Sequence, residues 1–185
     1  MKTIKITTPI TKETVKSLKA GDRVFISGTI YTARDTAHKR IFELIANKEK
    51  LPFELEGAVI YYVGPSPAKP GQVIGSAGPT TSSRMDSFTP ILLEKGLKGM
   101  IGKGKRSPDV IKAIKKYKAV YFAATGGAAA LLAKTVKDSD LIAFFELGTE
   151  AIYKLEVKDF PAIVINDMYG NDLYEKVGGS KLWKI

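Results

Sequence analysis

Short apolar runs typical of buried strands alternate with helical segments along most of this chain, and this alternation restricts the fold more than any other feature. β-Branched and aromatic residues fill Arg23–Gly28, Ala58–Val63 and Ala119–Ala124, as expected of strands. Arg34–Asn47 instead carries apolar residues at helical spacing, and Ser107 before Pro108 offers the start of another helix. The pattern predicts a mixed α/β fold, and the length of 185 residues predicts one domain over residues 1–185.

Weaker patterns complete the expected order of elements. Val73–Ala77 and Lys98–Ile101 are interpreted as strands, and the apolar run Leu141–Leu147 is expected to be buried on both faces. Alternation in Ile152–Lys158 indicates a half-exposed strand, followed by a last core strand at Pro161–Ile165. The other expected elements are a rigid loop at Pro65–Gly71, a helix from Met85 to Gly96, a helix from Pro108 to Tyr117 and a small-residue helix at Gly126–Thr135.

The chain contains no cysteine and a single histidine, His38. Disulfides, thiolate zinc sites, cysteine nucleophiles and an iron–sulfur cluster held by this chain are therefore excluded. One histidine also excludes a metal site built from several histidines. The chemistry of any active site must come from carboxylates, hydroxyls, cations and backbone groups.

No secretory signal and no membrane span are expected. The residues from Met1 to Lys16 mix charged and apolar side chains without a continuous apolar segment. The longest uncharged stretch, Ala119–Ala133, is interrupted by glycines and is shorter than the roughly 20 apolar residues that a span needs. Together with the absence of cysteine, these features predict a cytoplasmic protein without a membrane partner.

A glycine-rich segment, Gly99–Lys105, nearly matches a phosphate-binding P-loop, but Arg106 stands where Ser or Thr would hold magnesium. Nucleotide hydrolysis is therefore not favoured. The plainest interpretation is a basic surface turn that carries Lys103, Lys105 and Arg106. The pair Gly126 and Gly127 lacks the spacing of a dinucleotide site and is better explained by packing of a helix on the sheet.

Two predicted junctions before helices carry hydroxyl groups and arginines. The four residues Thr80–Ser83 are all hydroxylic, and Arg84 follows in the first turn. Free N–H groups and the helix dipole make such a place suited to an anion, although a simple N-cap explains it equally well. At the other junction, Arg34 lies at the start of a predicted helix, where the helix dipole favours acidic side chains, and this unfavourable position indicates a specific task for Arg34. His38, one turn further on, is more typical of a packed or capping residue than of a catalyst.

Five groups of short motifs follow one another between about Pro9 and Tyr174. They are Gly28-Thr29 with Thr32–Asp35 and His38, Gly57 with Tyr61–Pro65, Gly78–Thr81 with Arg84–Asp86, Gly102–Gly104 with Arg106-Ser107, and Glu150-Ala151 with Asp159–Ala162. Taken together, these motifs resemble the β subunit, or C-terminal region, of class I fumarases and the related L-tartrate dehydratases. Several motifs in a consistent order are far more specific than any one alone.

The resemblance implies a fold, an activity, a cofactor and a partner. Enzymes of this family reversibly add water to fumarate to give L-malate, or dehydrate tartrate. Their N-terminal region or α subunit holds a [4Fe–4S] cluster through three cysteines, and an open iron site acts on the hydroxyl as a Lewis acid. A chain without cysteine is then the β subunit of a hetero-oligomer. Its implied fold is a three-layer swivelling β/β/α domain that closes over the active site.

The dicarboxylate-binding positions of the family fall on Arg34, Thr80, Thr81, Arg84 and Lys103. By resemblance, Arg34 and Arg84 clamp carboxylates, Lys103 contacts the second carboxylate, and Thr80 moves the C3 proton. General chemistry agrees, because guanidinium groups bind carboxylates bidentately and fixed cations stabilise the charge that develops as a proton leaves carbon.

Four further positions lie in or between the same motifs without an expected role in the chemistry. Asp35 and His38 match motif positions but are not expected to act on the substrate directly. Ser82-Ser83 stands where the family more often has Ala-Gly, and we expect this departure to leave the turn intact.

Two alternatives remain open. L-Tartrate is one, since clamping residues recognise carboxylates common to both acids; fumarate is favoured because central metabolism needs that activity in more organisms. A basic nucleic-acid-binding module is the other, prompted by a net charge of +10. Nucleic acid is not favoured as a partner, because the aromatic residues do not interleave with Lys and Arg and the basic clusters Lys103–Arg106 and Lys112–Lys118 are short.

Overall fold

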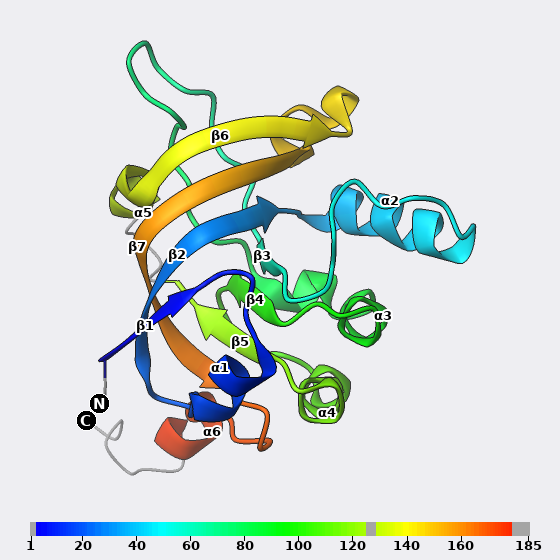
Figure 1. Ribbon diagram of the computed structural model, residues 1–185, viewed down its shortest axis with the longest axis vertical. Coiled ribbons are helices and arrows are strands. Elements are labelled where there is room, and N and C mark those ends of the chain that lie inside the picture. The colour runs from blue at the N-terminus through cyan, green and yellow to red at the C-terminus, as the bar shows by residue number, and fades with distance from the viewer. Residues whose placement is uncertain (1–2, 125–128, 179–185) are drawn as a thin grey trace.

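A seven-stranded sheet forms the centre of the molecule (Figure 1). The computed structural model describes residues 3–124 and 129–178. In sheet order the strands are β1 (Thr3–Thr7), β2 (Arg23–Thr32), β3 (Val59–Tyr61), β4 (Gly99–Gly102), β5 (Val120–Ala123), β7 (Ile152–Asn166) and β6 (Val136–Ala143). Strands β1 to β5 pair in parallel, whereas β7 is antiparallel to its neighbours, so the prediction of a mixed α/β fold is confirmed.

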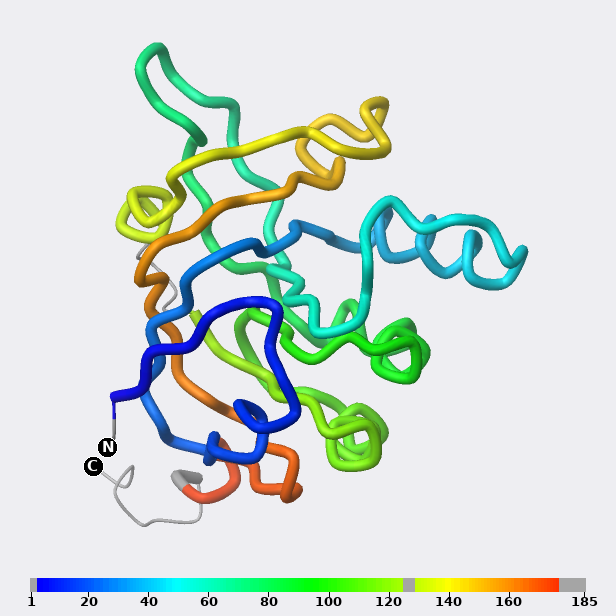
Figure 2. The backbone as a smooth tube through the Cα atoms, in the orientation of Figure 1, coloured from blue at the N-terminus to red at the C-terminus, as the bar shows by residue number. Residues whose placement is uncertain are grey.

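The long strand β7 folds the sheet back on itself. It pairs with β5 near Val164 and with β2 over the register that runs from Arg23↔Ile163 to Tyr31↔Lys154. Strands β2, β3, β4, β5 and β7 are thereby connected in a closed circuit, and the tube in Figure 2 shows β7 running beside β2. The β2–β7 ladder shifts register beside Gly28, where φ is +104° and a Cβ would lie 2.6 Å from Thr8 Oγ1. A glycine is needed there because the bulge brings β2 against the end of β1.

Helices cover one side of the central strands. α2 (Asp35–Ala46), α3 (Thr89–Glu94) and α4 (Pro108–Tyr117) lie together beside β3, β4 and β5 in Figure 1. The other helical elements are α1 (Lys12–Ser17), α5 (Ala129–Thr135), α6 (Leu173–Gly178) and the 3-10 turns η1 (Ser82–Met85) and η2 (Phe145–Glu150). No helix in residues 3–124 or 129–178 has the length and apolarity needed to cross a bilayer.

The central strands are buried on both faces. In β3 and the residues after it, Val59, Tyr61 and Val63 belong to the core inside the circuit of strands. Their neighbours Ile60 and Tyr62 belong to a second core, between the strands and α2, α3 and α4. Burial on both faces explains why β3 and β5 lie in continuous apolar runs that the sequence marks clearly.

Several predicted elements match the structure closely. The runs Ala58–Val63 and Ala119–Ala124 contain β3 and β5, and Arg34–Asn47 contains α2. The runs Arg23–Gly28 and Lys98–Ile101 overlap β2 and β4, but β2 continues to Thr32 and β4 to Gly102. The hydroxyl of Ser107 caps α4, because it accepts a hydrogen bond from the N–H of Val110. The described part of the small-residue helix is α5, and its predicted start at Gly126 lies outside the described residues.

Two predictions about the loops and edges are wrong. Val73–Ala77 is not a strand, because Ser66 satisfies the backbone N–H groups of Gly75 and Ser76 within the same loop. Leu141–Leu147 is not buried on both faces: it spans the end of the edge strand β6 and the start of η2, and the side chain of Phe145 is 66% exposed.

Two boundaries also differ from the prediction. Ile152–Lys158 and Pro161–Ile165 are not separate strands but parts of β7. The helix expected from Met85 to Gly96 is divided into η1 and α3, and α3 begins only at Thr89, with Pro90 in its first turn. A proline is tolerated in a first turn and disrupts a helix interior, which places the break here.

Candidate functional site

The five predicted site residues lie at one edge of the sheet, beyond the carboxyl ends of β2, β3 and β4. Arg34 follows β2 and Lys103 follows β4, while the segment Thr80–Arg84 returns to the same edge. Its backbone is fastened there: the N–H of Thr80 donates to Tyr62 O at 2.7 Å, and the N–H of Lys103 donates to Thr80 O at 3.3 Å. In α/β proteins with parallel strands, whether the sheet is open or closed, ligands bind beyond the carboxyl ends of the strands.

Four charged side chains form a chain of contacts at this edge. Nε of Arg84 donates to Oδ1 of Asp35 at 2.7 Å. Nε of Arg34 lies 4.0 Å from Oδ2 of the same carboxylate, and Nη2 of Arg34 lies 3.3 Å from Oε1 of Glu150. The carboxylate of Asp35 therefore stands between the two arginines predicted to clamp a dicarboxylate.

Glu150 is a site residue that sequence reasoning missed, although it lies in one of the motifs. The side chain of Arg34, at the N-cap of α2, makes no capping hydrogen bond. Oε2 of Glu150 instead accepts from the N–H of Thr36 at 3.2 Å, so a carboxylate from η2 caps α2. An acidic group at a helix N-terminus is favourable, which offsets the unfavourable position of Arg34.

Gly64 lets the Arg34 side chain lie against the backbone. A Cβ at this position would lie 2.8 Å from Nη1 of Arg34 and 3.0 Å from the carbonyl oxygen of Thr149. The motif containing Gly64 therefore contributes space rather than a functional group.

Arg106 does not lie on a basic surface turn, as the sequence predicted, because its side chain is fully buried. Nε donates to Oδ1 of Asp86 at 2.7 Å, Nη2 to Oγ1 of Thr89 at 2.6 Å and Nη1 to the hydroxyl of Tyr62 at 3.2 Å. The other oxygen of Asp86 accepts from the N–H of Ser107 at 2.7 Å. Burial acts against the charge, but the nearby Tyr62 and Asp86 outweigh it and raise the pKa of Arg106.

A second buried contact joins the same two segments. Tyr121 donates its hydroxyl hydrogen to Gly104 O at 2.9 Å, so the hydroxyl of Ser82, 2.8 Å away, donates to Tyr121. A Cβ at Gly102 would clash with Oγ of Ser82, so a glycine is needed there. Ser82, which stands where the family more often has alanine, therefore fits the turn before Arg84. Its hydroxyl is buried and hydrogen-bonded, and the turn is formed.

His38 is a packed residue beneath the site. Its side chain is fully buried, with its ring edge-on to that of Tyr62. Nδ1 lies 2.8 Å from Arg34 O, and because a carbonyl only accepts, Nδ1 carries the hydrogen. Burial lowers the pKa of His38 to about 4, so the ring is neutral at pH 7 and holds the turn that carries Arg34.

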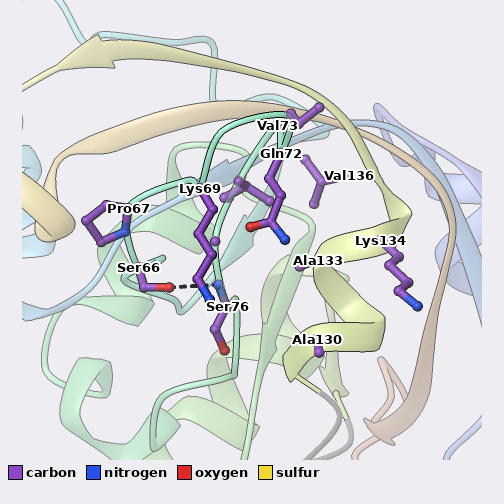
Figure 3. A pocket seen from close by; sticks show the side chains of 12 residues that line it. Ser66, Pro67, Lys69, Gln72, Val73, Ser76, Ala130, Ala133, Lys134 and Val136 are labelled. Carbon is purple, nitrogen blue, oxygen red and sulfur yellow. Dashed lines mark hydrogen bonds between the residues drawn. The ribbon is translucent and has the colours of Figure 1, made fainter.

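The site is an open face. The side chain of Arg84 is 51% exposed, and Lys103 and Thr81 are also exposed. A cavity of about 440 Å³ lies elsewhere, between the loop after β3 and the elements α5 and β6 (Figure 3). None of the five predicted residues lines it.

The described residues offer cations and hydroxyls but no metal site. Within residues 3–124 and 129–178, no three acidic or histidine side chains gather where they could hold a metal ion. The whole chain has no cysteine. An iron–sulfur cluster therefore does not fit this chain's own residues.

Comparisons with known proteins agree with this chemistry. The family described as Fumarase C-terminus matches residues 1–177. A Methanocaldococcus jannaschii protein provisionally named L(+)-tartrate dehydratase subunit beta is 45% identical over 91% of this chain and 89% of its own length. Fumarate hydratase 2 of Leishmania major is 42% identical over 89% of this chain, and the aerobic class I fumarate hydratase of Escherichia coli 41% identical over 84%. The chain spans only 29% of the length of either hydratase.

The buried position of Arg106 generates a stability prediction. Arg106→Met leaves the carboxylate of Asp86 without its cation, so we expect a loss of about 3 kcal/mol or more in the free energy of unfolding. Lys105→Met, at the exposed neighbouring position, is the control and should change it by less than about 0.5 kcal/mol. Urea denaturation measures both, and equal effects of the two substitutions would contradict the structural role of Arg106.

His38 generates a prediction about pH. Its pKa in the folded protein is about 4, below the ordinary value of 6.5, so the unfolded chain binds the proton first as pH falls. Stability is therefore full above pH 6.5 and lost toward pH 4, with a loss of about 2 kcal/mol between pH 7 and pH 5. Urea titrations at these pH values measure it. Because His38 is the only histidine, His38→Gln should flatten the dependence, and an unchanged slope would contradict the assignment.

Proposed function

The chain belongs to the family of class I fumarate hydratases and tartrate dehydratases, as a β subunit or C-terminal region, and from this we propose that it serves a hydro-lyase that interconverts fumarate and L-malate. The observation that carries the proposal is the placement of Arg34, Arg84 and Lys103 at one open edge of the sheet. Three cations there match a substrate that is a dianion.

The cations have two tasks in the proposed reaction. The guanidinium groups of Arg34 and Arg84 bind the substrate carboxylates and fix their orientation, because planar forks match carboxylate geometry. Removing the C3 proton of malate places further charge on the neighbouring carboxylate. Fixed cations, Lys103 among them, stabilise that charge in the transition state more than in bound malate, and this difference raises the rate.

Thr80 is the proposed proton-transfer group. Two backbone hydrogen bonds, to Tyr62 and from Lys103, fix its main chain at the sheet edge. A threonine hydroxyl is a weak base, and nearby cations favour its ionised form. The same backbone contacts hold Thr81 beside Lys103, where it is proposed to contact the substrate.

A cysteine-bearing α subunit is the proposed partner and the proposed holder of the [4Fe–4S] cluster. Two features support it: this chain supplies no thiolate, and the candidate site is an open face that another chain can complete. The helices on one side of β3, β4 and β5, with two cores on opposite faces of these strands, are consistent with a three-layer domain. We propose that this single domain swivels over the partner's face in the cytoplasm.

L-Tartrate is a second candidate substrate, and a specific observation favours it. The Methanocaldococcus jannaschii relative carries the tartrate dehydratase name and matches this chain over 89% of its own length. A role in nucleic-acid binding has less support, because three of the cations that prompted it are accounted for by a dicarboxylate.

Reconstitution tests the proposal directly. We expect the purified chain alone to be inactive, and to give malate dehydration when combined without oxygen with the cysteine-bearing α subunit. Comparing kcat/KM for malate and L-tartrate in that complex decides between the two acids. Activity of the chain alone without iron, or no activity of the complex on either acid, would contradict the proposal.

Substitution of Arg84 tests the clamp. Arg84→Ala removes a cation that stabilises the developing charge, so kcat/KM of the complex should fall by about 100-fold or more. Arg40→Ala is a matched control, because Arg40 is a similarly exposed arginine of α2 that pairs with Glu146 rather than with the site. Equal kinetics of the two variants would refute the role of Arg84.

Thr80→Val tests the proton transfer. It removes the hydroxyl with little change of shape, so kcat should fall by roughly 100-fold or more with a small change in KM. Steady-state kinetics of the complex measures both constants. A raised KM with unchanged kcat would show that Thr80 only binds the substrate.

A further inference from the structure

Asp35 places a carboxylate in a site whose proposed substrate is a dianion. The presence of a negative side chain beside a negative substrate needs an explanation. A carboxylate repels the substrate, so direct contact with it would weaken binding. The side chain of Asp35 instead contacts two arginines, at 2.7 Å for Nε of Arg84 and 4.0 Å for Nε of Arg34. Its role must therefore be sought in what it does to these guanidinium groups.

The atoms involved leave the substrate-binding side of Arg84 available. A guanidinium carries five N–H donors, one on Nε and four on the two Nη atoms. Asp35 occupies the Nε donor of Arg84. Within the part of the chain that the structure describes, neither Nη atom of Arg84 has a hydrogen-bond or ion-pair partner. The Nη pair is the bidentate edge that a second carboxylate needs.

Arg34 is held in a comparable way. Glu150 contacts one of its Nη atoms at 3.3 Å, while Nε faces Oδ2 of Asp35 without a hydrogen bond. The carboxylate of Asp35 also lies between two like charges and lowers their mutual repulsion. Asp35 is itself well fixed, because it is the first residue of α2 and this helix packs into the core through Ala37 and Ile41.

An exposed ion pair contributes little to stability, but the contact of Asp35 with the two arginines differs from the ordinary surface pair. Surface pairs hold two mobile side chains in place at an entropic cost that cancels most of the attraction. Asp35 is only 30% exposed and Arg34 only 24%, and one carboxylate serves two cations. The arrangement is suited to fixing orientation, which matters more to a bidentate clamp than the energy of the pair.

We propose that Asp35 is a positioning residue, whose carboxylate holds Arg84 by Nε and stands beside Arg34, so that the Nη edge of Arg84 is left to face the dicarboxylate. This inference rests on the proposed function. It makes Asp35 act through Arg84, so its effect on the reaction disappears when Arg84 is absent.

A double-mutant cycle in the reconstituted complex tests this coupling. We expect Asp35→Ala to lower kcat/KM for malate by roughly 10- to 100-fold, because a misplaced clamp costs about that much. In the Arg84→Ala background, the same substitution should lower kcat/KM by less than about 3-fold. Glu146→Ala, which removes the exposed pair with Arg40, is the matched control and should leave kcat/KM unchanged.

A conservative variant separates positioning from a structural role. Asp35→Asn keeps an oxygen that can accept from Nε of Arg84, so it should recover most of the kcat/KM lost in Asp35→Ala. If circular dichroism shows that Asp35→Ala does not fold, the cycle is carried out with Asp35→Asn. Its smaller loss should again vanish in the Arg84→Ala background.

The outcomes distinguish the inference from the function on which it rests. An active wild-type complex in which Asp35→Ala matches wild type, or in which the losses from Asp35 and Arg84 substitutions multiply, overturns the positioning role alone. A wild-type complex without activity on malate or tartrate overturns the proposed function and the positioning role together.

Discussion

The buried contact between Arg106 and Asp86 is the interaction on which the candidate site depends. It joins the turn after β4, which carries Lys103, to the segment that carries Thr80 and Arg84. Two backbone hydrogen bonds between Lys103 and this segment, and the buried hydroxyl contact of Ser82 with Tyr121, lie beside it. A charged group so deep in the protein is tolerated because every edge of the guanidinium has a polar or aromatic partner.

This buried network supports a surface that is rich in charge and open. Two arginines and a lysine stand beside two carboxylates, Asp35 and Glu150, and each carboxylate contacts an arginine. Glu150 is the last residue of η2, two residues before β7 begins. The strand that closes the circuit therefore also positions one carboxylate of the site. Acidic residues hold the two arginines, buried residues hold the backbone, and the side chains of Arg84 and Lys103 remain exposed. An open site of this kind is consistent with a second chain that completes it.

The local parts of the fold could be predicted from sequence, and the non-local parts could not. Continuous apolar runs marked β3 and β5, because these strands are buried on both faces. The joining of two predicted strands into β7 depends on pairing with β2, more than a hundred residues away in sequence. Arg106 was expected at the surface because its burial depends on Asp86 and Tyr62, which no local pattern reveals. Among the candidate site residues, the family motifs gave the positions proposed to bind substrate, and they included Asp35 and Glu150, but they did not reveal that these two carboxylates contact the arginines. Glu150 belonged to a motif, yet its capping of α2 is visible only in three dimensions.

The central claim is that Arg34 and Arg84 clamp a dicarboxylate, and a structure of the assembled enzyme with malate bound tests it most directly. The measured quantities are the distances from the substrate carboxylate oxygens to the guanidinium nitrogens. We expect Nη atoms of Arg84 and of Arg34 within about 2.7–2.9 Å of carboxylate oxygens, with Asp35 still on Nε of Arg84. Malate bound only by the partner chain, or at a place remote from both arginines, would contradict the claim.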